Sequence, residues 1–172
     1  LNIHHTYVEE SIPLILQYSN RVAEVHGHHY TEVLKINTLF NEAANELASH
    51  MQKEETILFP YIKSLLSLEL AKEPLNSPPF GSINNPITMM EMEHEAVGDI
   101  FKEIAALTNN YTPPEDACNT FRALYAKLDE FEQDLHQHIH LENNILHPKA
   151  KQLEQNLINN CDLINSTFEG GS

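Results

Sequence analysis

The chain has 172 residues, which fit one domain with a sizeable hydrophobic core. Asp and Glu number 25 against 10 Lys and Arg, for a formal net charge of −15, so nucleic acid is not expected as a partner. No apolar run approaches the ~20 residues that span a bilayer, which excludes a membrane protein. The two cysteines lack C-x-x-C spacing and favour a reducing, cytoplasmic location. The 11 histidines, which outnumber Lys and Arg together, are the unusual feature.

Few glycines and abundant Leu, Ala, Glu and Ile predict an all-α protein. The first helix is expected over residues 3–25 and ends at Gly27, which suits a left-handed C-cap. A second helix is expected over residues 30–68. Residues 69–85 contain three prolines and a glycine, which predicts a long crossing loop rather than a helix.

The second half of the chain predicts two more helices. Asn85-Pro86 opens the third helix as N-cap and first-turn proline, and this helix should end near residues 108–110. The capping box Thr112-Pro113-Pro114-Glu115 opens a fourth helix that should run to about residue 155. The expected architecture is an up-down-up-down four-helix bundle over residues 1–155, followed by a loosely held C-terminal tail at residues 156–172.

Each predicted helix carries an apolar stripe at three- and four-residue spacing that is interrupted by His or Glu. Burying such groups without partners would cost several kcal/mol each, so something must compensate them. The stripe of the fourth helix comprises Phe121, Leu124, Leu128, Phe131, Leu135, His138, Glu142 and Ile145. The other stripes carry His5 and His26 in the first helix, His50 and Glu54 in the second and His94 in the third.

These polar residues repeat along the chain. His50 and Glu54 are four residues apart, as are His138 and Glu142, and this i, i+4 spacing places both side chains of each pair on one helical face. Two helix pairs therefore each present one lone histidine and one His-x-x-x-Glu pair, which predicts a pseudo-two-fold ligand cage. The pattern His50-x-x-x-Glu54-x-x-Ile57-Leu58-x-Pro60 matches His138-x-x-x-Glu142-x-x-Ile145-Leu146-x-Pro148 at an offset of 88, and His5-x-x-Val8 matches His94-x-x-Val97 at an offset of 89.

Four imidazoles and two carboxylates that converge inside a bundle suit a pair of iron ions. We expect Glu54 and Glu142 to bridge the ions, two histidines to bind each ion, and an oxo, hydroxo or water bridge to complete part of the shell. Each iron would then have about five ligands and room for a small diatomic molecule. Imidazole and carboxylate also accept manganese and zinc. The predicted metal ligands are His5, His50, Glu54, His94, His138 and Glu142.

The remaining histidines are expected to lie outside the cage. About 31 Å of helix separates His26 from His5, so we expect His26 to act as a cap or to make a hydrogen bond at the end of the hairpin. It could become a ligand only if the helix breaks near Pro13 and shortens this distance. The alternation in the fourth helix lets only His138 face inward. The histidines expected at the surface are His4, His28, His29, His136, His140 and His147.

Two further groups are less defined by the pattern. Glu46 and Glu93 lie beside ligand positions, where they could be outer acceptors, part of an ion path or solvated charges. Cys118 and Cys161 are expected to be inert thiols because no partner for either is evident.

The chain resembles the hemerythrin-like domain of the iron–sulfur cluster repair di-iron proteins, the RIC (repair of iron centres) family. The likeness extends from His4-His5 to about Lys151. Its specific stretches are Glu24–Gly27, Ser49–Pro60, Met92–Glu95, Thr108–Pro114 with Ala117-Cys118 following, and Asp134–Asn144.

This resemblance implies that His5, His50, His94 and His138 bind iron and that Glu54 and Glu142 bridge it. It also implies a stress-response role in restoring iron–sulfur clusters damaged by nitric oxide or peroxide, through iron donation, nitric oxide handling, or both. The implied partners are damaged iron–sulfur proteins and a diatomic ligand, nitric oxide or dioxygen. Nitric oxide reductase-like catalysis and a non-enzymatic repair role both stay open, as does a homodimer.

Family members commonly carry a small N-terminal domain with an adjacent cysteine pair, which this chain does not contain. The chain is therefore expected to be either the C-terminal domain of a longer protein or a stand-alone form. The main alternative function is a hemerythrin-type dioxygen carrier or sensor, which a fifth ligand from His26 would favour. A ferritin-like protein would need more carboxylates in the stripes, and a metal-free bundle would leave six polar core residues unexplained.

Overall fold

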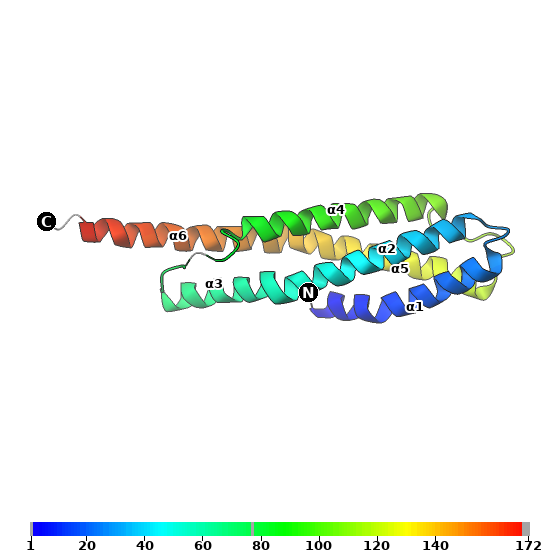
Figure 1. Ribbon diagram of the computed structural model, residues 1–172, viewed down its shortest axis with the longest axis horizontal. Helices are drawn as coiled ribbons and strands as arrows, with labels where there is room; N and C mark the ends of the chain where they lie inside the picture. Colours follow the sequence, from blue (N-terminus) through cyan, green and yellow to red (C-terminus); the bar gives the residue numbers. More distant parts are fainter. Residues whose placement is uncertain (1, 77, 170–172) are drawn as a thin grey trace. The chain divides into compact units, whose positions relative to one another are not determined.

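The computed structural model describes residues 2–76 and 78–169, in which helices are joined by loops and turns and no strand occurs (Figure 1). This confirms the predicted all-α class. None of the described helices combines the length and the apolarity that crossing a bilayer requires. The elements are α1 (Asn2–His26), α2 (Glu32–Lys53), a π-helical turn η1 (Glu54–Leu58), α3 (Phe59–Ala71), α4 (Asn84–Leu107), α5 (Asn119–Leu141), a second π-helical turn η2 (Glu142–Leu146) and α6 (His147–Glu169).

The chain divides into two compact units. The first unit comprises residues 1–49 and 93–139, and the second comprises residues 50–92 and 140–172. In the first unit, α1, the N-terminal part of α2, the C-terminal part of α4 and α5 alternate in direction along the chain (Figure 1). This unit therefore has the up-down-up-down arrangement that the sequence predicted.

Three phenylalanines from three helices form the centre of the first unit. Phe40 of α2 meets Phe101 of α4 and Phe131 of α5 edge-on, with ring centroids 6.3 and 5.7 Å apart. Phe101 and Phe131 stack at 5.6 Å. These aromatic contacts join α2, α4 and α5 by burial of large apolar side chains. Val8, Ile15 and Val22 of α1 are also buried, at the seven-residue spacing of one helical face.

The second unit has its own apolar core, in which α3 packs against α6. Glu154 of α6 is buried and accepts hydrogen bonds from the Tyr61 hydroxyl at 2.7 Å, the Ser82 hydroxyl at 2.7 Å and the Ile83 amide at 2.9 Å. These bonds attach α6 to α3 and to the segment before α4. The core residues are Leu58, Leu65, Ile83, Ile87, Met90, Ala150 and Leu157.

The start of the fourth bundle helix differs from the prediction. Residues 112–115 do not open a helix, and α5 begins at Asn119. The Arg122 guanidinium donates to the carbonyls of Glu115 at 2.6 Å, Ala117 at 3.0 Å and Pro114 at 3.3 Å. A side chain thus satisfies carbonyl groups that helical amides would otherwise have satisfied, and the segment remains a loop.

Two other boundaries also differ from expectation. Gly27 follows α1 as predicted, but it does not have the left-handed conformation. Glycine is required there because a Cβ atom would lie 2.4 Å from the Ala23 carbonyl oxygen and 2.6 Å from the Leu34 side chain. At the other end, α6 continues past Gln155 to Glu169, since no glycine or proline interrupts the sequence between Pro148 and Gly170.

Candidate metal site

All six predicted ligands are buried, with relative exposures between 0 and 5%. This matches the expectation that the apolar stripes run through them. They divide evenly between the two units, with His5, His94 and His138 in the first unit and His50, Glu54 and Glu142 in the second.

The three histidines of the first unit come together from three helices. The ring centroid of His138 on α5 lies 6.0 Å from that of His5 on α1 and 6.0 Å from that of His94 on α4. A ligand nitrogen of His138 lies within 4.8 Å of one on each of these two histidines. Clustered buried imidazoles are typical of a site for a divalent transition metal.

A fourth histidine supports this cluster, against the prediction that it lies at the surface. His4 is buried, and its ring stacks on His138 with centroids 3.7 Å apart and an interplanar angle of 11°. Its Nδ1 also forms a hydrogen bond with the Asp134 carboxylate. Burial raises the pKa of Asp134, while the nearby His138 acts in the opposite direction. Asp134 thereby holds His4 against His138, the kind of contact that fixes the orientation of a ligating ring.

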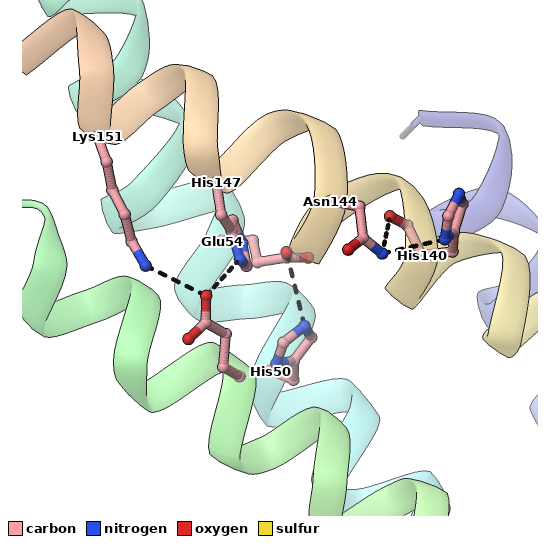
Figure 2. A network of polar contacts seen from close by, with 7 residues as sticks. His50, Glu54, His140, Asn144, His147 and Lys151 are labelled. Carbon is pink, nitrogen blue, oxygen red and sulfur yellow. Dashed lines mark hydrogen bonds and ion pairs between the residues drawn. The ribbon is translucent and has the colours of Figure 1, made fainter.

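In the second unit, His50 lies beside both carboxylates. Its Nε2 is 3.5 Å from Oε1 of Glu54 (Figure 2). A ligand nitrogen of His50 also lies within 4.8 Å of a carboxylate oxygen of Glu142. Two carboxylates that are 0% exposed carry a high desolvation penalty, which a bound cation would offset. The donor set of oxygen and imidazole nitrogen suits iron, manganese or zinc.

Each of these carboxylates begins a π-helical turn. The Phe59 amide donates to the Glu54 carbonyl, and the His147 amide donates to the Glu142 carbonyl, so both bonds span five residues instead of four. A proline, Pro60 or Pro148, follows each turn by two residues. Because proline has no amide hydrogen and its ring crowds the carbonyl four residues earlier, we attribute the wider turn to it. The repeated Glu-to-Pro motif thus produces a repeated backbone feature at both carboxylates.

The π-turns change which later side chains face the core. Ile145, which the stripe placed inside, is 42% exposed, whereas His147, which was expected at the surface, is 0% exposed. A five-residue turn rotates the following helix by about one residue, or roughly 100°, relative to a regular α-helix. His147 Nδ1 lies 3.6 Å from Oε1 of Glu91, and Lys151 Nζ lies 3.3 Å from the same oxygen. Figure 2 labels His147 and Lys151 on α6.

Four other histidines are exposed as predicted, namely His28, His29, His136 and His140. His140 contacts the side chain of Asn144 one turn later (Figure 2). Of the two carboxylates whose role was left open, Glu46 is exposed and Glu93 is half-buried.

His26 makes the hydrogen bond at the end of the hairpin that the sequence predicted. Its Nε2 lies 3.3 Å from Sγ of Cys118, and its ring packs on Phe121 with centroids 5.3 Å apart. The helix α1 continues through Pro13 without a break, so His26 stays about 31 Å along the helix from His5. Cys118 thus has a partner that the sequence did not reveal, while the side chain of Cys161 lies outside the described residues.

Comparison with known proteins also indicates a cation-binding domain. The sequence profile described as "Hemerythrin HHE cation binding domain" matches residues 1–150. The chain is 40% identical over 147 residues to proteins named iron-sulfur cluster repair protein YtfE from Yersinia pseudotuberculosis serotype IB (strain PB1/+) and from Yersinia pestis (strain Pestoides F). The matched region covers 86% of this chain and 61% of each relative.

Proposed function

Because the chain belongs to the family of hemerythrin HHE cation-binding domains, we propose that it is the di-iron domain of an iron–sulfur cluster repair protein. The similarity to the YtfE proteins confirms the resemblance to the cluster repair family seen in the sequence. The chain spans about three-fifths of the length of these relatives, so the activity of the whole protein is part of the proposal. The proposed iron ligands are His5, His50, Glu54, His94, His138 and Glu142.

The observation that carries the proposal is the burial of this donor set. In the first unit, ligand nitrogens of His5 and His94 each lie within 4.8 Å of one on His138, and in the second unit His50 lies beside Glu54 and Glu142. Glu54 and Glu142 are the two donors with two oxygens each, so each can bridge a pair of ions. Their negative charges offset the positive charge of two iron ions in a low-dielectric interior.

Bound iron would supply an exchangeable, redox-active metal with a coordination position open to a small ligand such as nitric oxide. The residues of this chain would hold it and control access to it. Asp134 and His4 would keep His138 in one orientation, and the apolar stripes on either side of the ligands would exclude bulk water. We propose that an oxo or hydroxo bridge completes the pair.

We propose that this centre serves damaged iron–sulfur proteins, either by donating iron or by removing nitric oxide. Cys118 is a free thiol, which fits a reducing compartment such as the cytoplasm. The alternative function, a dioxygen carrier with five histidine ligands, gains no support, because His26 contacts Cys118 and lies at the far end of the unbroken helix α1 from His5.

The test is direct transfer of labelled iron. The chain would be loaded with an iron isotope and incubated anaerobically with an iron–sulfur protein whose cluster has been damaged by nitric oxide. We expect the cluster spectrum to recover and the label to enter the rebuilt cluster, or the nitrosyl signal to decline without label transfer if the centre removes nitric oxide. Controls are the Glu54→Ala variant and free iron at the same concentration. Recovery no better than with free iron would contradict the repair function.

A further inference from the structure

A cysteine–histidine pair, Cys118 and His26, lies in the first unit, at the opposite end of α1 from His5. Cys118 is exposed and free, and its Sγ lies 3.3 Å from Nε2 of His26. A thiol within hydrogen-bond distance of an imidazole can transfer its proton to that base, and the thiolate is the nucleophilic form of cysteine. Cys118 is therefore not an isolated cysteine but one half of a nucleophile–base pair.

The position of Cys118 on the backbone also suits a reacting sulfur. The Cys118 carbonyl accepts the Arg122 amide at 3.0 Å, which makes Cys118 the residue that caps the N-terminus of α5. The N-terminus of a helix of 23 residues carries a partial positive charge that stabilises an adjacent anion. The nearby Asp116 carboxylate is engaged elsewhere, since it accepts a hydrogen bond from the Tyr30 hydroxyl.

A pocket of about 270 Å³ lies beside the sulfur. Val22 and Val25 give it an apolar wall, and the side chains of both reactive residues line it. The imidazole is also held in place by its contact with Phe121. The pocket is large enough for a small molecule and too small for a folded protein partner. Its lining comprises Arg21, Val22, Val25, His26, Cys118 and Thr120.

We propose that Cys118 and His26 form a thiol-modification site that reacts with low-molecular-mass disulfides. His26 takes the proton of the Cys118 thiol, and the sulfur attacks one sulfur of the disulfide. A new S–S bond forms to Cys118 as the S–S bond of the reagent breaks. The departing sulfur leaves with the bonding electron pair and receives the proton from His26. The reagent is the only oxidant, and the products are a mixed disulfide and one small thiol. This site is independent of the proposed metal centre.

The test is the rate at which the full chain reacts with dipyridyl disulfide, measured by absorbance of the released pyridinethione. A Cys161→Ser background leaves Cys118 as the only thiol. We expect the folded protein to react at least about ten-fold faster than the same chain unfolded in urea, because the imidazole and the helix terminus act only in the folded state. Mass spectrometry should find one adduct, on Cys118.

The His26→Gln variant should lose about ten-fold in this rate, whereas His28→Gln, an exposed neighbouring histidine, should lose nothing. Because His26 also packs on Phe121, circular dichroism must show that the variant is folded at the assay temperature. If the variant is not folded, the test is the rate of the folded Cys161→Ser chain, which keeps His26, compared with the rate of the same chain unfolded in urea. A folded-state rate equal to the unfolded rate, or an unchanged rate in folded His26→Gln, would overturn the proposal.

Discussion

Glu54 and Glu142 are the residues on which the proposed metal centre depends most. Both are completely buried, and both lie close to His50 in the second unit. An ionised carboxylate in such a position needs positive charge or several hydrogen-bond donors nearby to be tolerated. The proposed pair of metal ions would satisfy this need for both residues at once.

Replacing either carboxylate should therefore remove metal. We expect Glu54→Ala and Glu142→Ala to reduce iron from about two ions per chain to one or none, because each side chain would bridge both ions. His136→Ala and His140→Ala, which alter exposed residues of α5, the helix that carries His138, should retain full iron content. Elemental analysis of the purified variants measures this. Equal losses in all four variants would show that the assignment of the inward face is wrong.

Asp134 is expected to affect metal affinity without touching the metal. It forms a hydrogen bond with His4, whose ring stacks on His138. Removing such an outer partner typically weakens metal binding by about 10- to 100-fold. Asp134→Ala should show this loss in competition with a chelator, while Glu130→Ala, one turn earlier and exposed, should bind as tightly as the unaltered protein. Matching affinities in the two variants would rule out the positioning role.

At the level of elements, the two π-turns set the register of α3 and α6. In the second unit, Glu142 faces His50 while Ala150, Glu154 and Leu157 of α6 face the core. Both conditions are met only because η2 contains one residue more than a regular helical turn. The same extra residue occurs in η1 after Glu54.

Deleting Asn144, an exposed residue within η2, should convert this turn to a regular α-helix. The helix α6 would then rotate by about 100° relative to Glu142, so the metal ligand and the core face could not both keep their contacts. We expect the deletion to lower the melting temperature and the metal content together. The substitution Asn144→Ala serves as the control and should change neither by much. A deletion variant that keeps both properties would contradict the role assigned to the turn.

The elements also show what sequence reasoning could and could not find. Local i, i+4 spacing and the repeat at offset 88 predicted the helices and the buried state of all six candidate ligands. The buried position of His147 was missed because a constant period of 3.6 residues does not hold across a π-turn. The later start of α5 was missed because Arg122 binds the loop carbonyls through its side chain. The proline two residues after each π-turn was the sequence signal that could have predicted the buried position of His147.

Contacts between distant segments were beyond the reach of periodicity. His4 and Asp134 are 130 positions apart, and His26 and Cys118 are 92 apart. Neither pair follows from helical spacing, because each depends on which helix ends become neighbours in the first unit. His4 directly precedes the proposed ligand His5 on α1, so the helical period alone places the two side chains on different faces and does not predict the stacking of His4 on His138.

For the whole molecule, metal binding and stability should be coupled. All six proposed ligands are buried, so a metal bound to them would favour the folded chain over the unfolded one. When the free metal concentration is 100 times the dissociation constant, binding adds about 2.7 kcal/mol to the free energy of unfolding. For a chain of this size that corresponds to a rise of about 5–10 °C in melting temperature.

We therefore expect calorimetry to show a lower melting temperature after iron is removed with a chelator, and recovery when iron is restored. The buried carboxylates would lose their compensating charge in the metal-free form. A Glu54→Ala variant, which should hold one iron or none, should show a smaller fall in melting temperature after the chelator treatment than the unaltered chain. An unaltered chain that melts no lower without metal would contradict the buried cage.

Metal content per chain tests most directly whether this chain holds two iron ions. The protein would be expressed in iron-replete medium, purified without chelator or affinity metal, and measured by elemental analysis against an accurate protein concentration. We expect about two irons per chain, with little zinc or manganese. A folded protein without bound metal would contradict the proposed centre and, with it, the repair function.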